Sequence, residues 1–166
     1  IKMDKVICNA DPPTVYNEMI KDSRFQKKIS RKIYSSKYSM GLFVLFFGTK
    51  KKYNQVAHHT IWMGPRFKTL LRDIFNRKVL SEDFSLYIHR PTATDNSFAP
   101  AGCDSFYVLC PVPNLLGNID WKIEGPALKK RIILALNNTI LPSLIDVITD
   151  DFYMTPEDFA ADYRSM

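Results

Sequence analysis

The stretch SLYIHRPTATDNSFAPAGCDSFYVLCPVP, from Ser85 to Pro113, decides the fold. Two apolar, aromatic-rich runs, 85–89 and 105–109, flank a segment rich in proline, glycine, asparagine and aspartate. Such residues interrupt regular structure, so the pattern predicts two strands joined by a loop. Alternation in the first run predicts one buried face. The second run is almost continuously apolar, which predicts a strand covered on both faces and stopped by Pro111 and Pro113.

The segments on either side of this stretch predict further strands and helices, in the order β-α-α-β-β-α-β-β-α-β-α. The predicted strands are 5–10, 39–49, 58–63 and part of 144–153. The predicted helices are 14–20, one within 21–37, 66–77, 127–141 and one from Thr155. Asp11 is the predicted N-cap of the first helix, a loop with Trp121 precedes the helix between Pro126 and Pro142, and the last helix begins with a capping-box pattern. Antiparallel strand pairs with helices between them predict an α+β fold, with a mixed or antiparallel sheet and flanking helices.

Composition indicates a folded protein with a substantial core. The 166 residues are 46% hydrophobic and 24% charged, which excludes a disordered chain. The 13% aromatic share is high for this length. It indicates either a strand-rich core or a cavity for a large apolar ligand, and both readings stay open at this point.

The net charge of +6 favours an anionic partner, and much of it is local. The segment 21–37 carries seven basic residues against one aspartate, interleaved with apolar residues at helical spacing. This pattern is typical of a solvated helix face or of a helix that docks on an anionic membrane surface. No basic-aromatic motif of a known nucleic-acid module is present, so we expect no nucleic-acid partner.

The three cysteines have no metal-ligand spacing and are odd in number, which favours a reducing compartment. The apolar run 40–48 is too short to span a bilayer, and no segment has the pattern of a signal peptide. Because the chain begins at Ile1 within what looks like a strand-forming segment and stops at Met166 without a tail, we expect it to be a piece of a longer protein.

The sequence contains no phosphate-binding glycine loop, nucleophile elbow or zinc-protease motif. His58 and His59 are adjacent, and neighbouring strand residues point to opposite faces, so no shared metal site is predicted. His89 with Asp95 or Asp104 is a conceivable acid/base pair, although a structural role for His89 is the simpler interpretation. The catalytic residues stay unassigned.

A resemblance to a known family is carried by many ordered blocks. They are VICNAD (6–11), SSKYSMGLFVLFFGTKKKY (35–53), AHHTIWMGPRFKTLLRDIF (57–75), DFSLYIHRPTATDNSFAPAGCDSFYVLCPVPNL (83–115), IDW (119–121) and MTPEDF (154–159). In this order and spacing they resemble the bacterial-type phytoene desaturases, flavin amine oxidase-like oxidoreductases of carotenoid biosynthesis.

The resemblance implies the central fragment of a two-domain flavoprotein that lacks both dinucleotide-binding ends. Residues 1–13 would end the FAD-binding α/β domain, 14–153 would form the substrate-binding domain, and 154–166 would begin the return to the FAD-binding domain. Asn9, Ala10 and Asp11 are the implied cofactor-binding residues. The fragment alone would bind FAD weakly or not at all and would be inactive.

The implied reaction is FAD-dependent desaturation of phytoene, a C40 carotenoid precursor, by hydride transfer to the flavin and loss of a proton from the adjacent carbon. An apolar tunnel would hold the polyene, with wall candidates Phe43, Phe46, Tyr87, Phe106 and Tyr107. The expected location is peripheral, on the cytoplasmic side of a membrane, with contacts from Arg24, Lys27, Lys28, Arg31 and Lys32. A homo-oligomer is left open.

Two other functions remain as alternatives. One is a stand-alone module that binds a lipid or carotenoid without redox activity. The other is a related enzyme, either a desaturase of a C30 substrate or a carotenoid isomerase.

Overall fold

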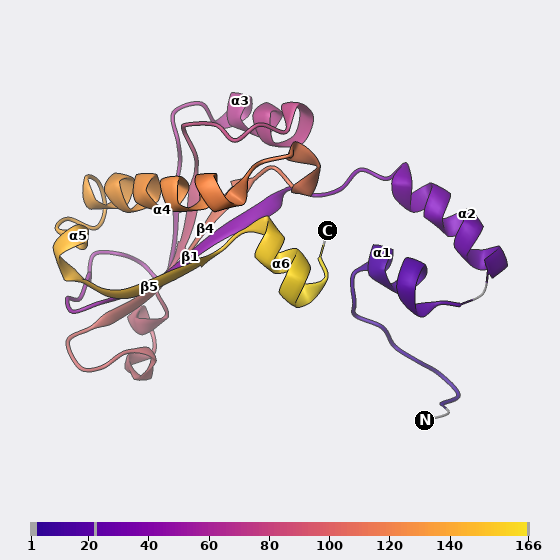
Figure 1. The fold of residues 1–166 in the computed structure, drawn as a ribbon. Helices are drawn as coiled ribbons and strands as arrows, with labels where there is room; N and C mark the ends of the chain where they lie inside the picture. The colour runs from indigo at the N-terminus through magenta and orange to yellow at the C-terminus, as the bar shows by residue number, and fades with distance from the viewer. Residues whose placement is uncertain (1–2, 22, 166) are drawn as a thin grey trace.

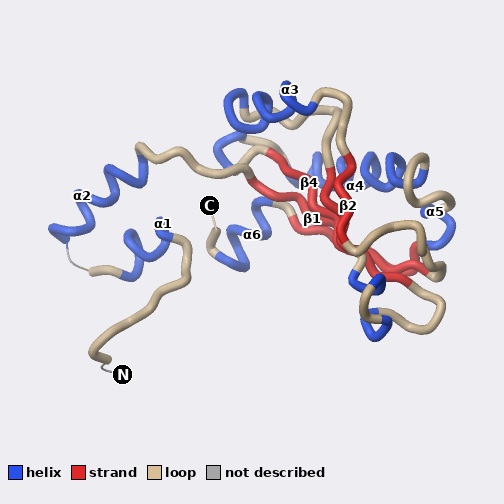
Figure 2. The backbone as a smooth tube through the Cα atoms, turned by 180° about the vertical axis from the view of Figure 1, so that it is seen from behind, coloured by secondary structure: helices blue, strands red, loops and turns tan. Residues whose placement is uncertain are grey.

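The computed structural model describes residues 3–21 and 23–165. Its centre is an antiparallel sheet of five strands in the order β2-β3-β4-β1-β5. Figure 2 shows the strands in red. The strands are β1 (Gly41–Thr49), β2 (His59–Trp62), β3 (Leu86–His89), β4 (Asp104–Val112) and β5 (Ile148–Met154). The prediction of an α+β fold is therefore confirmed, and of the predicted mixed or antiparallel sheet the structure shows the antiparallel form.

The helices lie on one face of the sheet and beyond its end. They are α1 (Pro12–Thr14), continued by a π-helical turn over Val15–Met19, α2 (Ser23–Tyr34), α3 (Phe67–Arg72), continued by a second π-helical turn over Asp73–Arg77, α4 (Trp121–Asn137), α5 (Leu144–Val147) and α6 (Pro156–Tyr163). Figure 1 shows α4 along the sheet, whereas α1 and α2 lie away from the strands.

The core lies between the sheet and α4. Side chains alternate along β1, β3 and β4, so every second one points to the helix side; these include Phe43, Leu45, Phe47, Leu86, Ile88, Phe106 and Val108, all buried. From α4, Leu128, Ile132 and Leu136 pack onto them at a spacing of four residues. The alternation predicted for the first run of the central stretch is confirmed.

The predicted limits of the long helix were wrong at both ends. Helix α4 begins at Trp121, because the Asp120 side chain accepts a hydrogen bond from the Lys122 amide at 3.1 Å and caps it. Trp121 is buried and stacks 6.4 Å from Phe43. Pro126 therefore lies inside the second turn, and the helix ends at Asn137, well before Pro142.

Strand β4 also differs from its prediction. It continues through Pro111 to Val112, and its buried and half-buried residues alternate along its whole length. Pro111 is tolerated because the pairing with β3 ends at Leu109, which leaves that side of β4 without a partner strand. An almost continuous apolar sequence here has one buried face and one face that is partly exposed.

The strand predicted at residues 5–10 is absent from the described fold. Val6 and Ile7 are 81% and 100% exposed, and the segment is irregular. An apolar run forms a strand only when a neighbour completes its hydrogen bonds, and none of the five strands pairs with this segment. Asp11 stands at the N-cap position of α1, as predicted.

The loop between β3 and β4 is fixed by a buried ion pair. The guanidinium of Arg90 lies 3.2 Å from the Asp104 carboxylate, and both side chains are buried. Asp104 also accepts hydrogen bonds from the Thr92 hydroxyl at 2.6 Å and from the Tyr53 amide at 2.7 Å. Arg90 Nε donates to the Val56 carbonyl at 2.9 Å. Asp104 is thus committed to Arg90 and does not pair with His89.

Gly64, just after β2, is a position where we expect a methyl group to be costly. A Cβ at Gly64 would lie 2.1 Å from the carbonyl oxygen of Phe84, so the backbone must shift. We expect Gly64→Ala to lower the free energy of unfolding by about 1–3 kcal/mol, measured by denaturant titration. In Gly48→Ala the new Cβ meets only the Thr149 hydroxyl, at 3.2 Å, so this control is expected to change stability less. Equal effects of the two substitutions would contradict the steric explanation.

Candidate functional site

The face of the sheet opposite α4 carries aromatic side chains from every strand. Register and alternation bring together Phe152 of β5, Phe46 of β1, Tyr107 of β4, Tyr87 and His89 of β3, and His59 of β2. We call these six residues the aromatic face. Phe46, Tyr87, His89 and Tyr107 are half-buried and Phe152 is 58% exposed. The face therefore remains accessible in this chain.

The rings of the aromatic face form a continuous series of contacts across the sheet. Phe46 stacks on Phe152 with ring centroids 4.5 Å apart and meets Tyr107 edge-on at 5.2 Å. Tyr107 meets Tyr87 and His89 edge-on, each at 6.2 Å. Edge-to-face and offset stacked geometries are favourable for aromatic pairs, so these contacts hold the rings in place.

A shallow hollow of about 400 Å³ lies at the β5 end of the aromatic face. Phe46, Tyr107 and Phe152 line it, with Asp150 and Asp151 among the other lining residues. Asp151 forms an ion pair with Lys129 of α4. The volume lies within the range of about 300–1,000 Å³ that is usual for small-molecule sites.

The middle of the aromatic face carries no net charge at neutral pH. Burial, together with the neighbouring Tyr87, raises the pKa of Tyr107, so its hydroxyl stays protonated. Burial and the nearby His58 and His59 lower the pKa of His89, so this imidazole stays neutral. An apolar, uncharged, aromatic surface suits a large apolar ligand, because each 100 Å² of apolar surface that is buried contributes about 2.5 kcal/mol.

The five predicted wall residues divide between the two faces of the sheet. Phe46, Tyr87 and Tyr107 lie together on the aromatic face, whereas Phe43 and Phe106 point into the core beneath α4. The five therefore do not form one wall, and their contact with a ligand stays a prediction. Phe152 was not predicted as a wall residue, because its pairing with Phe46 was not visible from the sequence.

The histidines also differ from their prediction. His58 precedes β2 and is not bound by strand alternation, so its ring lies 4.3 Å from that of His59 and on the same side. Both rings approach His89, and the three imidazoles form one cluster. The prediction that the side chains of His58 and His59 point to opposite faces was wrong, because His59 belongs to β2 and His58 does not.

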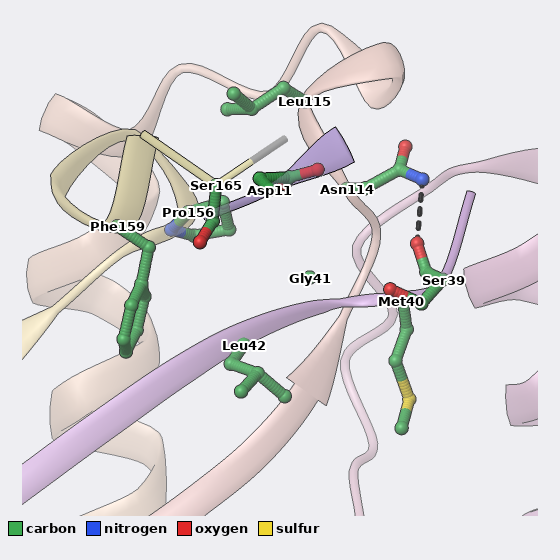
Figure 3. A pocket seen from close by; sticks show the side chains of 10 residues that line it. All are labelled: Asp11, Ser39, Met40, Gly41, Leu42, Asn114, Leu115, Pro156, Phe159 and Ser165. Carbon is green, nitrogen blue, oxygen red and sulfur yellow. Dashed lines mark hydrogen bonds between the residues drawn. The ribbon is translucent and has the colours of Figure 1, made fainter. Parts of the chain in front are cut away.

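The predicted cofactor-binding residues lie at the end of the sheet away from the histidines. Asn9 and Ala10 are exposed, and Asp11 lines a pocket of about 250 Å³ between the start of β1 and α6 (Figure 3). At the rim of this pocket the Asn114 amide donates to the Ser39 carbonyl at 2.8 Å. The six glycines of the chain include no phosphate-cradling series, so these residues do not fit a whole dinucleotide by themselves. Their cofactor role stays a prediction.

The predicted membrane-contact residues lie on α2. Lys27, Lys28, Arg31 and Lys32 are exposed, while Ile29 and Ile33 are half-buried. Arg24 belongs to α2, but its side chain lies outside the described residues. None of the described helices is both long enough and apolar enough to cross a lipid bilayer.

The structure thus shows an antiparallel sheet with an accessible aromatic face, and comparison with known proteins shows which proteins the chain resembles. No family model matches the chain. It is 43% identical over 155 residues to the lycopene-forming phytoene desaturase of Pantoea ananas, a match that covers 93% of this chain and 32% of that protein. Over 165 residues it is 40% identical to the neurosporene-forming phytoene desaturase of Rhodobacter capsulatus, covering 96% of this chain and 32% of that protein.

A third relative, the lycopene-forming phytoene desaturase of Pseudescherichia vulneris, is 42% identical over 158 residues, or 94% of this chain and 32% of its own length. By sequence, the chain is similar over nearly its whole length to one segment of the phytoene desaturases. It spans about a third of the length of the curated relatives it matches.

Proposed function

We propose that this chain is the substrate-binding part of a FAD-dependent phytoene desaturase, which introduces conjugated double bonds into a C40 polyene precursor. The observation that carries the proposal is the aromatic face, an accessible apolar surface that crosses all five strands in a chain related to phytoene desaturases over nearly its whole length. The flavin would accept the hydride and would be held mainly by residues outside this chain. Residues 14–153 would be the substrate domain, with residues 1–13 and 154–166 leading to the flavin domain.

The part played by this chain is to bind and orient the hydrocarbon. Phytoene has no polar group to hydrogen-bond, so its position must come from shape and from buried apolar area. The stacked rings of Phe46, Tyr107 and Phe152 offer a flat surface for a polyene. A protonated Tyr107 and a neutral His89 add no charge that would have to be desolvated when the ligand binds.

The identity values favour a C40 over a C30 substrate. The chain is 31% identical over 163 residues to the 4,4'-diapophytoene desaturase of a Methylomonas species, compared with 40–43% for the phytoene desaturases above. Relatives that form lycopene, neurosporene and zeta-carotene all match, so the number of double bonds introduced is not fixed by similarity.

The test is desaturation by the protein that contains this chain, supplied with FAD and with phytoene in lipid vesicles. We expect conjugated products, detected by their visible absorption after extraction and chromatography. Flavin-loaded protein that binds phytoene and leaves it unchanged would favour the module that binds an apolar ligand without redox activity. Turnover of the C30 precursor alone would favour the related C30 desaturase.

We further propose that α2 attaches this enzyme to the cytoplasmic surface of an anionic membrane, from which a hydrocarbon substrate is reached. The exposed side chains of Lys27, Lys28, Arg31 and Lys32 on α2, beside Ile29 and Ile33, support this arrangement. Each basic residue near an anionic surface contributes about 1 kcal/mol. We therefore expect Lys28→Gln/Lys32→Gln to weaken binding to phosphatidylserine-containing vesicles by about 30-fold, measured by vesicle co-sedimentation.

The matched control removes two exposed lysines from α4 in the variant Lys122→Gln/Lys130→Gln. This control lowers the net charge equally, and we expect it to leave vesicle binding within about twofold of the unaltered protein. Equal weakening by the two double variants would show that only net charge matters and would contradict a docking role for α2.

A further inference from the structure

All three histidines of the chain lie in one cluster at the β2 edge of the sheet. One ring nitrogen each of His58, His59 and His89 lies within 4.8 Å of the other two. Nε2 of His58 is 2.7 Å from Nε2 of His89, and β2 pairs with β3 so that His59 stands directly opposite His89. Two adjacent residues, His58 and His59, can both belong to the cluster, because the turn before β2 places the His58 ring on the same side as the His59 ring.

Hydroxyl groups orient two of the imidazoles from behind. Nδ1 of His58 lies 2.7 Å from the Thr94 hydroxyl, which itself donates to the Pro91 carbonyl at 3.3 Å. With the hydroxyl proton on that carbonyl, Nδ1 of His58 can donate to the hydroxyl oxygen and leave Nε2 with a free lone pair. Nδ1 of His59 is likewise 2.7 Å from the Tyr87 hydroxyl. Outer partners of this kind fix the tautomer and ring orientation of metal-binding histidines.

A metal ion binds a neutral imidazole through the ring nitrogen that carries no proton. Two nitrogens 2.7 Å apart share a single proton, so His89 Nε2 donates to the lone pair of His58 Nε2. When an ion replaces the shared proton, the His89 ring carries its proton on Nδ1 and remains neutral.

We propose that His58, His59 and His89 form a binding site for one first-row divalent transition-metal ion, with zinc as the representative ion. Tetrahedral zinc with bonds of about 2.0–2.1 Å to nitrogen needs nitrogens about 3.3 Å apart. The spacing in the cluster, from 2.7 Å to no more than 4.8 Å, includes this value, so small ring rotations complete the site. His59 is exposed, which leaves solvent access for the ion and for a water molecule as fourth ligand.

Such an ion would stabilise the attachment of the edge strand β2 to the sheet. Strand β2 has four residues and, among the described residues, β3 is its one partner strand, so its attachment rests on few contacts. A metal held by His58 and His59 on one side and His89 on the other would link the two strands. The ion would lie at the β2 end of the aromatic face, opposite Phe46 and Phe152, and it would undergo no redox change.

The test measures zinc binding to the full protein and to its His89→Gln variant by isothermal titration calorimetry, in a Cys8→Ser background because Cys8 is exposed. We expect the variant to bind one equivalent of zinc fewer. We also expect zinc to raise the thermal unfolding midpoint of the parent protein and to leave that of the variant unchanged, because only the folded cluster binds.

A second pair of variants keeps the test decisive if His89→Gln folds poorly. Thr94 is exposed and lies outside the strands, so Thr94→Val preserves the fold while it removes the outer partner of His58. We expect zinc affinity to fall by about 10–100-fold in Thr94→Val and to be retained in Thr94→Ser, which keeps the hydroxyl. Equal zinc stoichiometry in the parent and His89→Gln, or equal affinity in the Thr94 variants, would overturn the proposal.

Discussion

Phe46→Asp is expected to lower kcat/KM for phytoene desaturation by at least about 30-fold in the protein that contains this chain. Phe46 lies at the centre of the aromatic face, between Phe152 and Tyr107. Removing a buried phenylalanine contact costs about 1.5–3 kcal/mol, and a carboxylate beside a hydrocarbon adds a desolvation cost. A loss of 2 kcal/mol or more in transition-state binding corresponds to about 30-fold or more in rate. Initial rates of product formation at several phytoene concentrations measure the effect.

Two control variants separate this effect from damage to the fold. Phe46→Leu keeps an apolar side chain and is expected to retain most of the activity. Leu134 is exposed on α4, on the opposite side of the sheet, so Leu134→Asp introduces the same charge away from the aromatic face. An equal loss of activity in Leu134→Asp and Phe46→Asp, with folding intact by circular dichroism, would count against a substrate wall on this face.

Asp104→Ala is expected to have the largest effect on stability, a decrease of about 3–5 kcal/mol in the free energy of unfolding. The substitution leaves the Arg90 guanidinium buried without its counter-ion. It also removes the acceptor for the Thr92 hydroxyl and the Tyr53 amide. Because domains are stable by only about 5–15 kcal/mol, much of the folded population can be lost. Denaturant titration followed by circular dichroism measures the change.

Asp95→Ala is the matched control in the same loop. Asp95 is exposed, and its carboxylate accepts a hydrogen bond from the Ser97 amide at 2.8 Å, so its loss is expected to cost about 1 kcal/mol. In the double variant Arg90→Met/Asp104→Leu no buried charge remains, and we expect it to recover much of the stability lost in Asp104→Ala. A stability for Asp104→Ala no lower than for Asp95→Ala would contradict the structural role of the ion pair.

Local sequence patterns predicted the elements whose pattern matches their burial and hydrogen bonding in the fold. The alternation in 85–89 correctly gave the buried face of β3, and the apolar run 39–49 gave β1. The Thr155 side chain accepts from the Asp158 amide and the Asp158 side chain accepts from the Thr155 amide, which confirms the predicted capping box at the start of α6.

Elements that depend on distant partners were not predictable in the same way. Residues 5–10 have strand composition but no partner strand in the described fold. The long helix begins after the Asp120 cap and not at Pro126. The aromatic face requires the register of five strands, which no local pattern specifies. The histidine cluster depends on the chain turning just before β2, so the sequence placed His58 and His59 on opposite faces.

Photolabelling tests most directly whether the aromatic face binds the hydrocarbon. The full protein would be equilibrated in vesicles with a diazirine-bearing isoprenoid hydrocarbon, irradiated, and mapped by mass spectrometry. We expect labels on β1, β4 and β5 at Phe46, Tyr107 and Phe152, and we expect excess phytoene to suppress them. Labels on the outer side of α4 that phytoene suppresses, with these three residues unlabelled in an active enzyme, would contradict a substrate wall on the aromatic face.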